Sequence, residues 1–125
     1  MTFAVVVALL ALIEYMAIAM LTGRARGTCD IKAPATTGHP VFERWYRVQM
    51  NTVEQLVIFL PAFFLFARYV SPAWAGWIGL VWIVGRALYA RSYVADPETR
   101  ELGFALNVVP TAVLVLGALI GVLVD

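Results

Sequence analysis

Cysteine, histidine and net charge are all scarce in this chain of 125 residues. Cys29 is the only cysteine, so no disulfide can form within the chain. His39 is the only histidine, and no cluster of potential ligands predicts a metal site. The net charge is +1 and only 14% of residues are charged, a balance that argues against nucleic acid as a partner. These absences exclude an internal disulfide framework and disfavour metal or nucleic-acid binding.

Long apolar runs dominate what is present. Hydrophobic residues make up 62% of the chain, whereas a soluble domain is nearer half. A membrane-spanning helix needs about 20 mainly apolar residues. The first such run follows no basic segment and is longer than the apolar core of a signal peptide, so we predict a retained helix. We predict a single all-α integral membrane domain over residues 1–125, a four-transmembrane-helix bundle with helices at about 3–21, 41–69, 73–93 and 102–124.

The connections between these helices predict how the chain crosses the membrane. Residues 27–40 are rich in glycine and proline, Ser71-Pro72 predicts a tight turn, and Asp96-Pro97 predicts another. Nearly all basic residues lie in or beside the first and third connections: Arg24, Arg26, Lys32, Arg44, Arg47, Arg91 and Arg100. The positive-inside rule places that end in the cytoplasm. Frequent alanine, valine and arginine in a short chain favour a bacterial inner membrane over the endoplasmic reticulum.

Arg47, Asn51 and Glu54 are the most informative polar residues, because they open a helix that continues as hydrocarbon. Spacings of four and three place them on one side of that helix. Charged groups in a membrane helix are costly, so they usually face a bundle interior or a wet cavity. A cation, an amide and an anion in one stripe form a receptor for a small zwitterion.

A second polar face lies on the third helix. Arg86, Tyr89 and Tyr93 follow offsets of 0, 3 and 7, which places them on one side. A buried arginine needs a carboxylate and Glu54 lies at a comparable depth, so we predict an Arg86–Glu54 ion pair. The tyrosines by themselves are also compatible with an interfacial aromatic belt. Glu14, in the first helix, could pair with Arg86, handle protons or bond to a neighbouring helix.

The candidate polar groups gather at one end of the predicted bundle. They comprise three cations, an anion, two amides and two phenols: Arg26, Arg47, Arg100, Glu54, Gln49, Asn51, Tyr89 and Tyr93. Such a set suits a small, extended ligand that carries carboxylates and an ammonium group, as a tripeptide thiol does. A lipid-soluble second substrate could enter sideways from the bilayer. The alternative is that the arginines bind anionic lipid headgroups.

Gln49 constrains how one ligand could be held. At 100° per residue it lies about 200° around the helix from Arg47. The two side chains therefore cannot touch one ligand from the same helix. If both are ligands, the pocket lies between the subunits of an oligomer.

Several short motifs occur in a fixed order along the chain. Around the second helix they are Thr36-Thr37-Gly38, Phe42-Glu43-Arg44, Tyr46-Arg47-Val48-Gln49 and Asn51-Thr52-Val53-Glu54, and in the third they are Gly79-Leu80-Val81-Trp82, Gly85-Arg86, Tyr89 and Tyr93. Their order and spacing resemble the MAPEG family, the membrane-associated proteins in eicosanoid and glutathione metabolism. The resemblance is closest to the microsomal glutathione transferases and the leukotriene-forming synthase. It implies a homotrimer that binds glutathione in a cleft between neighbouring subunits.

The resemblance also implies a role for each candidate residue. Five fall on glutathione-binding positions of one subunit: Arg47, Asn51, Glu54, Tyr89 and Tyr93. Arg26 and Gln49 fall on positions that the neighbouring subunit supplies. Arg100 falls on the catalytic arginine, whose fixed guanidinium favours the thiolate of glutathione over the thiol.

The function that the resemblance implies is a glutathione transferase for lipophilic electrophiles, with reduction of lipid hydroperoxides as a further activity. Glutathione is then the co-substrate, and no metal is expected. Two alternatives stay open. One is a non-catalytic protein that presents lipid to a partner, and the other is a glutathione-dependent isomerase of the prostaglandin-synthase type.

Overall fold

A computed structural model describes residues 1–125 as four long α-helices with no β-strand. The helices are α1 (Thr2–Thr28), α2 (Pro40–Tyr69), α3 (Pro72–Ala95) and α4 (Glu101–Val124), and a short 3-10 helix, η1, spans Pro97–Thr99. All four α-helices are long and apolar enough to cross a membrane. The predicted four-helix transmembrane bundle is confirmed, and the protein is a multi-pass integral membrane protein.

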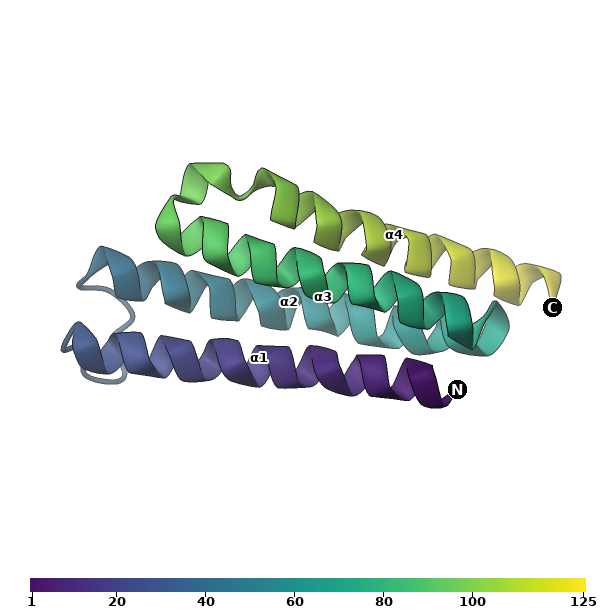
Figure 1. Ribbon diagram of the computed structural model, residues 1–125, viewed down its shortest axis with the longest axis horizontal. Coiled ribbons are helices and arrows are strands. Elements are labelled where there is room, and N and C mark those ends of the chain that lie inside the picture. The colour runs from purple at the N-terminus through teal and green to yellow at the C-terminus, as the bar shows by residue number, and fades with distance from the viewer.

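The four helices run antiparallel to their neighbours in the chain, so both termini lie at one end of the bundle (Figure 1). At the other end α1 and α3 finish and α2 and α4 begin, and we call this the polar end. Helices α2 and α3 pack against each other and against both outer helices. Helices α1 and α4 lie on opposite sides of this central pair (Figure 1).

Helix α1 is longer than the sequence predicted. We expected it to end near residue 21, but it continues to Thr28. The extension contains Gly23 and Gly27, but each glycine inside a helix costs only about 1 kcal/mol, and the residues between them are good helix formers. Arg26 then lies in the last turn, where a cation is favourable, and its Nη1 donates to the carbonyl oxygen of Ala35 at 2.8 Å. This bond ties the following loop to α1.

Side-chain caps set where α2 and α3 begin. The Nδ1 atom of His39 accepts from the backbone N–H of Val41 at 3.1 Å, and Ser71 Oγ accepts from that of Trp74 at 3.2 Å. Arg44 Nη1 donates to the carbonyl oxygen of Val94 at 3.1 Å, a partner that the end of a helix otherwise lacks. This bond holds the start of α2 against the end of α3 at the polar end.

Aromatic side chains fill the middle of the bundle. The rings of Phe59 and Trp82 stack with centroids 4.4 Å apart, and both side chains are fully buried. Asn107 Nδ2 donates to the carbonyl oxygen of Trp82 at 2.7 Å, which joins α4 to α3. On the outside, large apolar side chains such as Met20 and Leu123 are exposed, as a lipid-facing surface requires.

Two glycines let α4 approach its neighbours closely. A Cβ atom placed on Gly121 would lie 2.9 Å from the carbonyl oxygen of Tyr69 in α2. One placed on Gly103 would lie 2.6 Å from the Cα atom of Tyr89 in α3. Real Cβ atoms do not approach so closely, so only glycine permits this backbone contact. The first turn of α4 is therefore held directly beside Tyr89.

Candidate functional site

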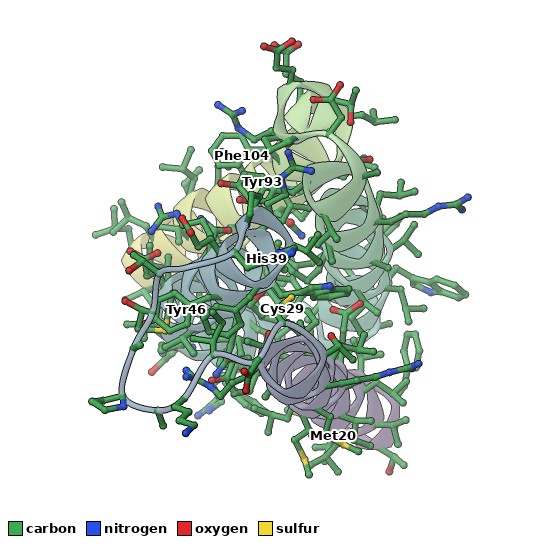
Figure 2. The ribbon with its side chains drawn as sticks, turned by 90° about the vertical axis from the view of Figure 1, so that its left-hand side faces the viewer. Met20, Cys29, His39, Tyr46, Tyr93 and Phe104 are labelled. Carbon is green, nitrogen blue, oxygen red and sulfur yellow. The ribbon has the colours of Figure 1, made fainter.

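A cavity of about 440 Å³ opens at the polar end among α2, α3 and the start of α4. Seven residues line it: Arg47, Asn51, Tyr89, Tyr93, Arg100, Glu101 and Phe104. Figure 2 looks onto the polar end and shows Tyr93 and Phe104 together, on the side away from Met20 of α1. Five of the eight residues that the sequence singled out as ligand-binding or catalytic therefore line a single cavity.

The lining of this cavity is rich in hydrogen-bond donors and positive charge. It offers two guanidinium groups, a carboxamide and two phenols, against a single carboxylate from Glu101. Small-molecule sites usually measure about 300–1,000 Å³, so the volume suits a ligand of small-peptide size. The chemistry matches a ligand with several carboxylates.

Helix periodicity brings four of the lining side chains together. Arg47 and Asn51 lie one turn apart on α2, and Tyr89 and Tyr93 lie one turn apart on α3. The two tyrosine rings stack with centroids 5.6 Å apart. The two helix faces meet across the cavity because α2 and α3 are antiparallel neighbours.

Arg100 reaches the cavity from the junction between η1 and α4. Its Nη1 atom donates to the carbonyl oxygen of Pro97 at 2.7 Å. The turn before it is braced by Asp96, whose Oδ1 accepts from the backbone N–H of Glu98 at 3.1 Å. Arg100 is thus an exposed guanidinium on a short, hydrogen-bonded turn.

Sequence reasoning missed two residues of the cavity. Glu101 follows Arg100 directly, and Phe104 lies one helical turn after Arg100. The one-turn spacing between Arg100 and Phe104 would have indicated Phe104 if the prediction had started α4 at residue 101 rather than 102. Phe104 gives the otherwise polar cavity an apolar wall.

The predicted Arg86–Glu54 ion pair is wrong. Arg86 is fully buried, and its Nη1 atom donates to Asn51 Oδ1 at 2.8 Å and to Thr52 Oγ1 at 3.2 Å. Glu54 instead pairs with Arg47. Its Oε1 atom lies 3.8 Å from Arg47 Nη1, and both side chains are more than half exposed. The carboxylate stays near water, where it is hydrated, while neutral oxygens of α2 serve the buried guanidinium.

Glu14 forms none of the contacts considered for it. It makes no ion pair with Arg86, and its buried Oε1 atom has no hydrogen-bond partner. It lies in a separate, largely apolar groove of about 470 Å³ between α1 and α3, where Ile18 and Ala90 are also found. This groove shares no lining residue with the cavity at the start of α4.

Arg26 and Gln49 lie outside the cavity of their own chain. Arg26 is placed over the ring of Phe42, 4.6 Å from its centroid, and holds the loop that follows α1. Gln49 Nε2 donates to the hydroxyl of Tyr15 in α1 at 3.4 Å. Both thus lie on the α1 side of α2, away from Arg47. For Gln49 this agrees with its predicted position on the opposite side of the helix from Arg47. Glu54, though on the same stripe as Arg47, does not line the cavity either.

No three histidine, cysteine or carboxylate side chains gather where they could hold a metal ion.

Known proteins resemble this chain over most of its length. It is 46% identical to an uncharacterized protein of Synechocystis sp. over a match of 114 residues, and this match covers 91% of this chain and 83% of that protein. It is 36% identical over 104 residues to microsomal glutathione S-transferase 2 of Homo sapiens, covering 83% and 71% of the two chains. It is 35% identical over 77 residues to leukotriene C4 synthase of Cavia porcellus, covering 62% and 51%. A sequence model of the MAPEG family matches residues 2–120. The chain belongs to the MAPEG family.

Proposed function

We propose that this protein is a membrane glutathione transferase, which joins the thiolate of glutathione to lipophilic electrophiles. The observation that carries the proposal is the donor-rich cavity at the polar end, in a MAPEG chain whose relatives include microsomal glutathione S-transferases. Glutathione has two carboxylates and an ammonium group, so it matches a cavity with two guanidinium groups and one carboxylate.

The residues of the cavity divide the work between binding and activation. Arg47, Asn51 and the phenols of Tyr89 and Tyr93 are suited to hold the carboxylates and amides of glutathione. Arg100 acts on the thiol. A free thiol has a pKa of about 8.5 and is mostly protonated at neutral pH, and a nearby guanidinium favours the thiolate. Since arginine stays charged, its role is electrostatic and the thiol proton leaves to water.

The reaction then needs no further group from the protein. The thiolate sulfur attacks an electrophilic carbon, a carbon–sulfur bond forms, and the leaving group departs with its electron pair. Phe104 gives the cavity an apolar wall against which a lipophilic electrophile from the bilayer could lie. A lipid hydroperoxide in the same place would be reduced to its alcohol as the thiolate sulfur takes the outer oxygen, and a second glutathione would then convert the oxidised sulfur to glutathione disulfide and water, which gives the proposed second activity.

We also propose that the working unit is a homotrimer with sites between subunits. Gln49 lies on the face of α2 turned away from the cavity, and Arg26 lies in the last turn of α1, so in this arrangement both serve the site of a neighbour. Glu54, exposed beside Arg47, would bind the ammonium group of glutathione at the edge of the site. The basic polar end faces the cytoplasm, where glutathione is available, and a bacterial inner membrane is the proposed location.

The experiment that tests the proposal measures thiolate formation by ultraviolet difference absorbance on detergent-purified protein. We expect wild type to bind glutathione as thiolate, and Arg100→Ala to lose the signal and about 10²-fold in kcat. Arg91→Ala is the matched control, because Arg91 is also exposed near the polar end but does not line this cavity. Wild-type protein that binds no glutathione would refute the proposal. If turnover gave an isomerised substrate and no glutathione conjugate, the protein would belong to the glutathione-dependent isomerases instead.

A further inference from the structure

Arg86 is a charged side chain that the proposed mechanism does not use. It is fully buried, and no carboxylate forms an ion pair with it. Burying a charge without an ion pair is costly, and ionisable groups inside a membrane bundle usually mark functional sites. What Arg86 contacts therefore indicates what it does.

Both hydrogens of one Arg86 nitrogen are used on α2. The Nη1 atom donates to Asn51 Oδ1 at 2.8 Å and to Thr52 Oγ1 at 3.2 Å. The hydroxyl of Thr52 donates its own proton to the carbonyl oxygen of Val48 at 2.6 Å, so the Thr52 oxygen is free to accept from Arg86. The directions of these hydrogen bonds are mutually consistent.

The contact decides which way the Asn51 amide points. A guanidinium can only donate, so the atom that Asn51 presents to Arg86 must be its oxygen. The Nδ2 group, with two N–H donors, is then left for the cavity that Asn51 lines. Without Arg86 the amide could turn over and present an acceptor instead.

Arg86 also lies against a second wall of the cavity. Its guanidinium carbon is 4.5 Å from the ring centroid of Tyr89, and Tyr89 stacks on Tyr93. Trp82 approaches the same guanidinium, with its ring centroid 5.7 Å away. One buried cation thus touches Asn51 and Tyr89, on opposite sides of the cavity, from beneath.

We propose that Arg86 is a positioning residue, which fixes the Asn51 carboxamide with its N–H donors facing the cavity and so makes Asn51 a donor to an anionic group of the ligand. This inference rests on the proposed function in taking glutathione as the probe. Arg86 itself does not line the cavity. Its effect on the ligand passes through Asn51.

The decisive variant is Asn51→Asp. An aspartate would still accept from Arg86, now through a charge-assisted bond, so the protein should fold and melt at or above the wild-type temperature. It would present negative charge to the cavity in place of two donors. We expect the Kd for glutathione, measured by calorimetry in detergent, to rise at least 10-fold.

Thr52→Val is the matched control. It removes the other acceptor of the same Arg86 nitrogen but leaves Asn51 in place, so the Kd for glutathione should stay within about twofold of wild type. Arg86→Lys, which keeps a buried donor, should bind glutathione more tightly than Arg86→Gln. Because Arg86 acts on binding, kcat at saturating glutathione should change less than Kd in both variants.

The outcomes separate this inference from the proposed function. Folded Asn51→Asp protein with wild-type affinity would overturn the positioning role while leaving the transferase intact. Asn51→Asp protein that does not fold would overturn it too, because it would show that Asn51 is not simply an acceptor towards Arg86. Wild-type protein without affinity for glutathione would instead overturn the proposed function itself.

Discussion

Gly103→Ala tests whether the contact between α3 and α4 positions Arg100. A Cβ atom at residue 103 would lie 2.6 Å from the Cα atom of Tyr89 and 2.9 Å from its Cβ atom. The backbone nitrogen of Tyr89 would be closer still, and carbon atoms in ordinary contact lie about 3.5 Å apart, so α4 would have to move away by at least about 0.9 Å. Arg100 is less than one turn from residue 103 and would move with it.

The size of the effect follows from that displacement. Overpacking of this kind typically costs about 1–3 kcal/mol of stability. A displacement of about 1 Å in a reacting geometry can cost on the order of 10²-fold in rate. We therefore expect Gly103→Ala to lower both the melting temperature and kcat/KM for glutathione conjugation, with kcat falling more than the affinity for glutathione.

The assay combines thermal unfolding in detergent with steady-state kinetics. Gly23→Ala is the matched control, because a Cβ atom there has no atom within 4 Å and the residue lies inside α1. That change should leave activity unaltered and raise stability by up to about 1 kcal/mol. Gly103→Ala protein as stable and as active as wild type would refute the claim that this close contact positions Arg100.

Two further substitutions test other parts of the bundle. Glu54→Gln breaks the Arg47–Glu54 pair, whose partners lie 3.8 Å apart and more than half exposed, so unfolding free energy should change by less than about 1 kcal/mol while glutathione affinity falls. A large loss of stability on chemical unfolding would contradict this view of the pair. Asn107→Ala removes a buried 2.7 Å bond to the carbonyl oxygen of Trp82 and should cost about 1–3 kcal/mol. An unchanged melting temperature would show that the bond does not help to hold α4 against α3.

Local sequence patterns were enough to predict the parts of the site that share one helix. Arg47 and Asn51 lie one turn apart, as do Tyr89 and Tyr93, and helical periodicity alone places each pair on one face. The same periodicity separated Gln49 from Arg47, and the structure places Gln49 on the α1 side of α2. These predictions required only that the segments be helical.

Contacts between helices could not be predicted in this way. Periodicity gives the direction of a side chain around its own helix, but not the rotation and depth of the neighbouring helix. Counting residues along the helices places Arg86 and Glu54 at comparable depth, yet Arg86 contacts the neutral oxygens of Asn51 and Thr52. The unpartnered position of Glu14 and the presence of Phe104 in the cavity depend on the same packing.

The sequence by itself determined that the chain crosses the membrane four times and gathers its polar groups at one end, because apolar run length and helical period act locally. Only the tertiary structure decided how those groups combine into a cavity. Close contacts such as that of Gly103 with Tyr89 fix how α4 lies against α3, and so which side chains meet. The sterics of that backbone contact, rather than any property of Arg100 alone, bring this arginine to the same cavity as Asn51.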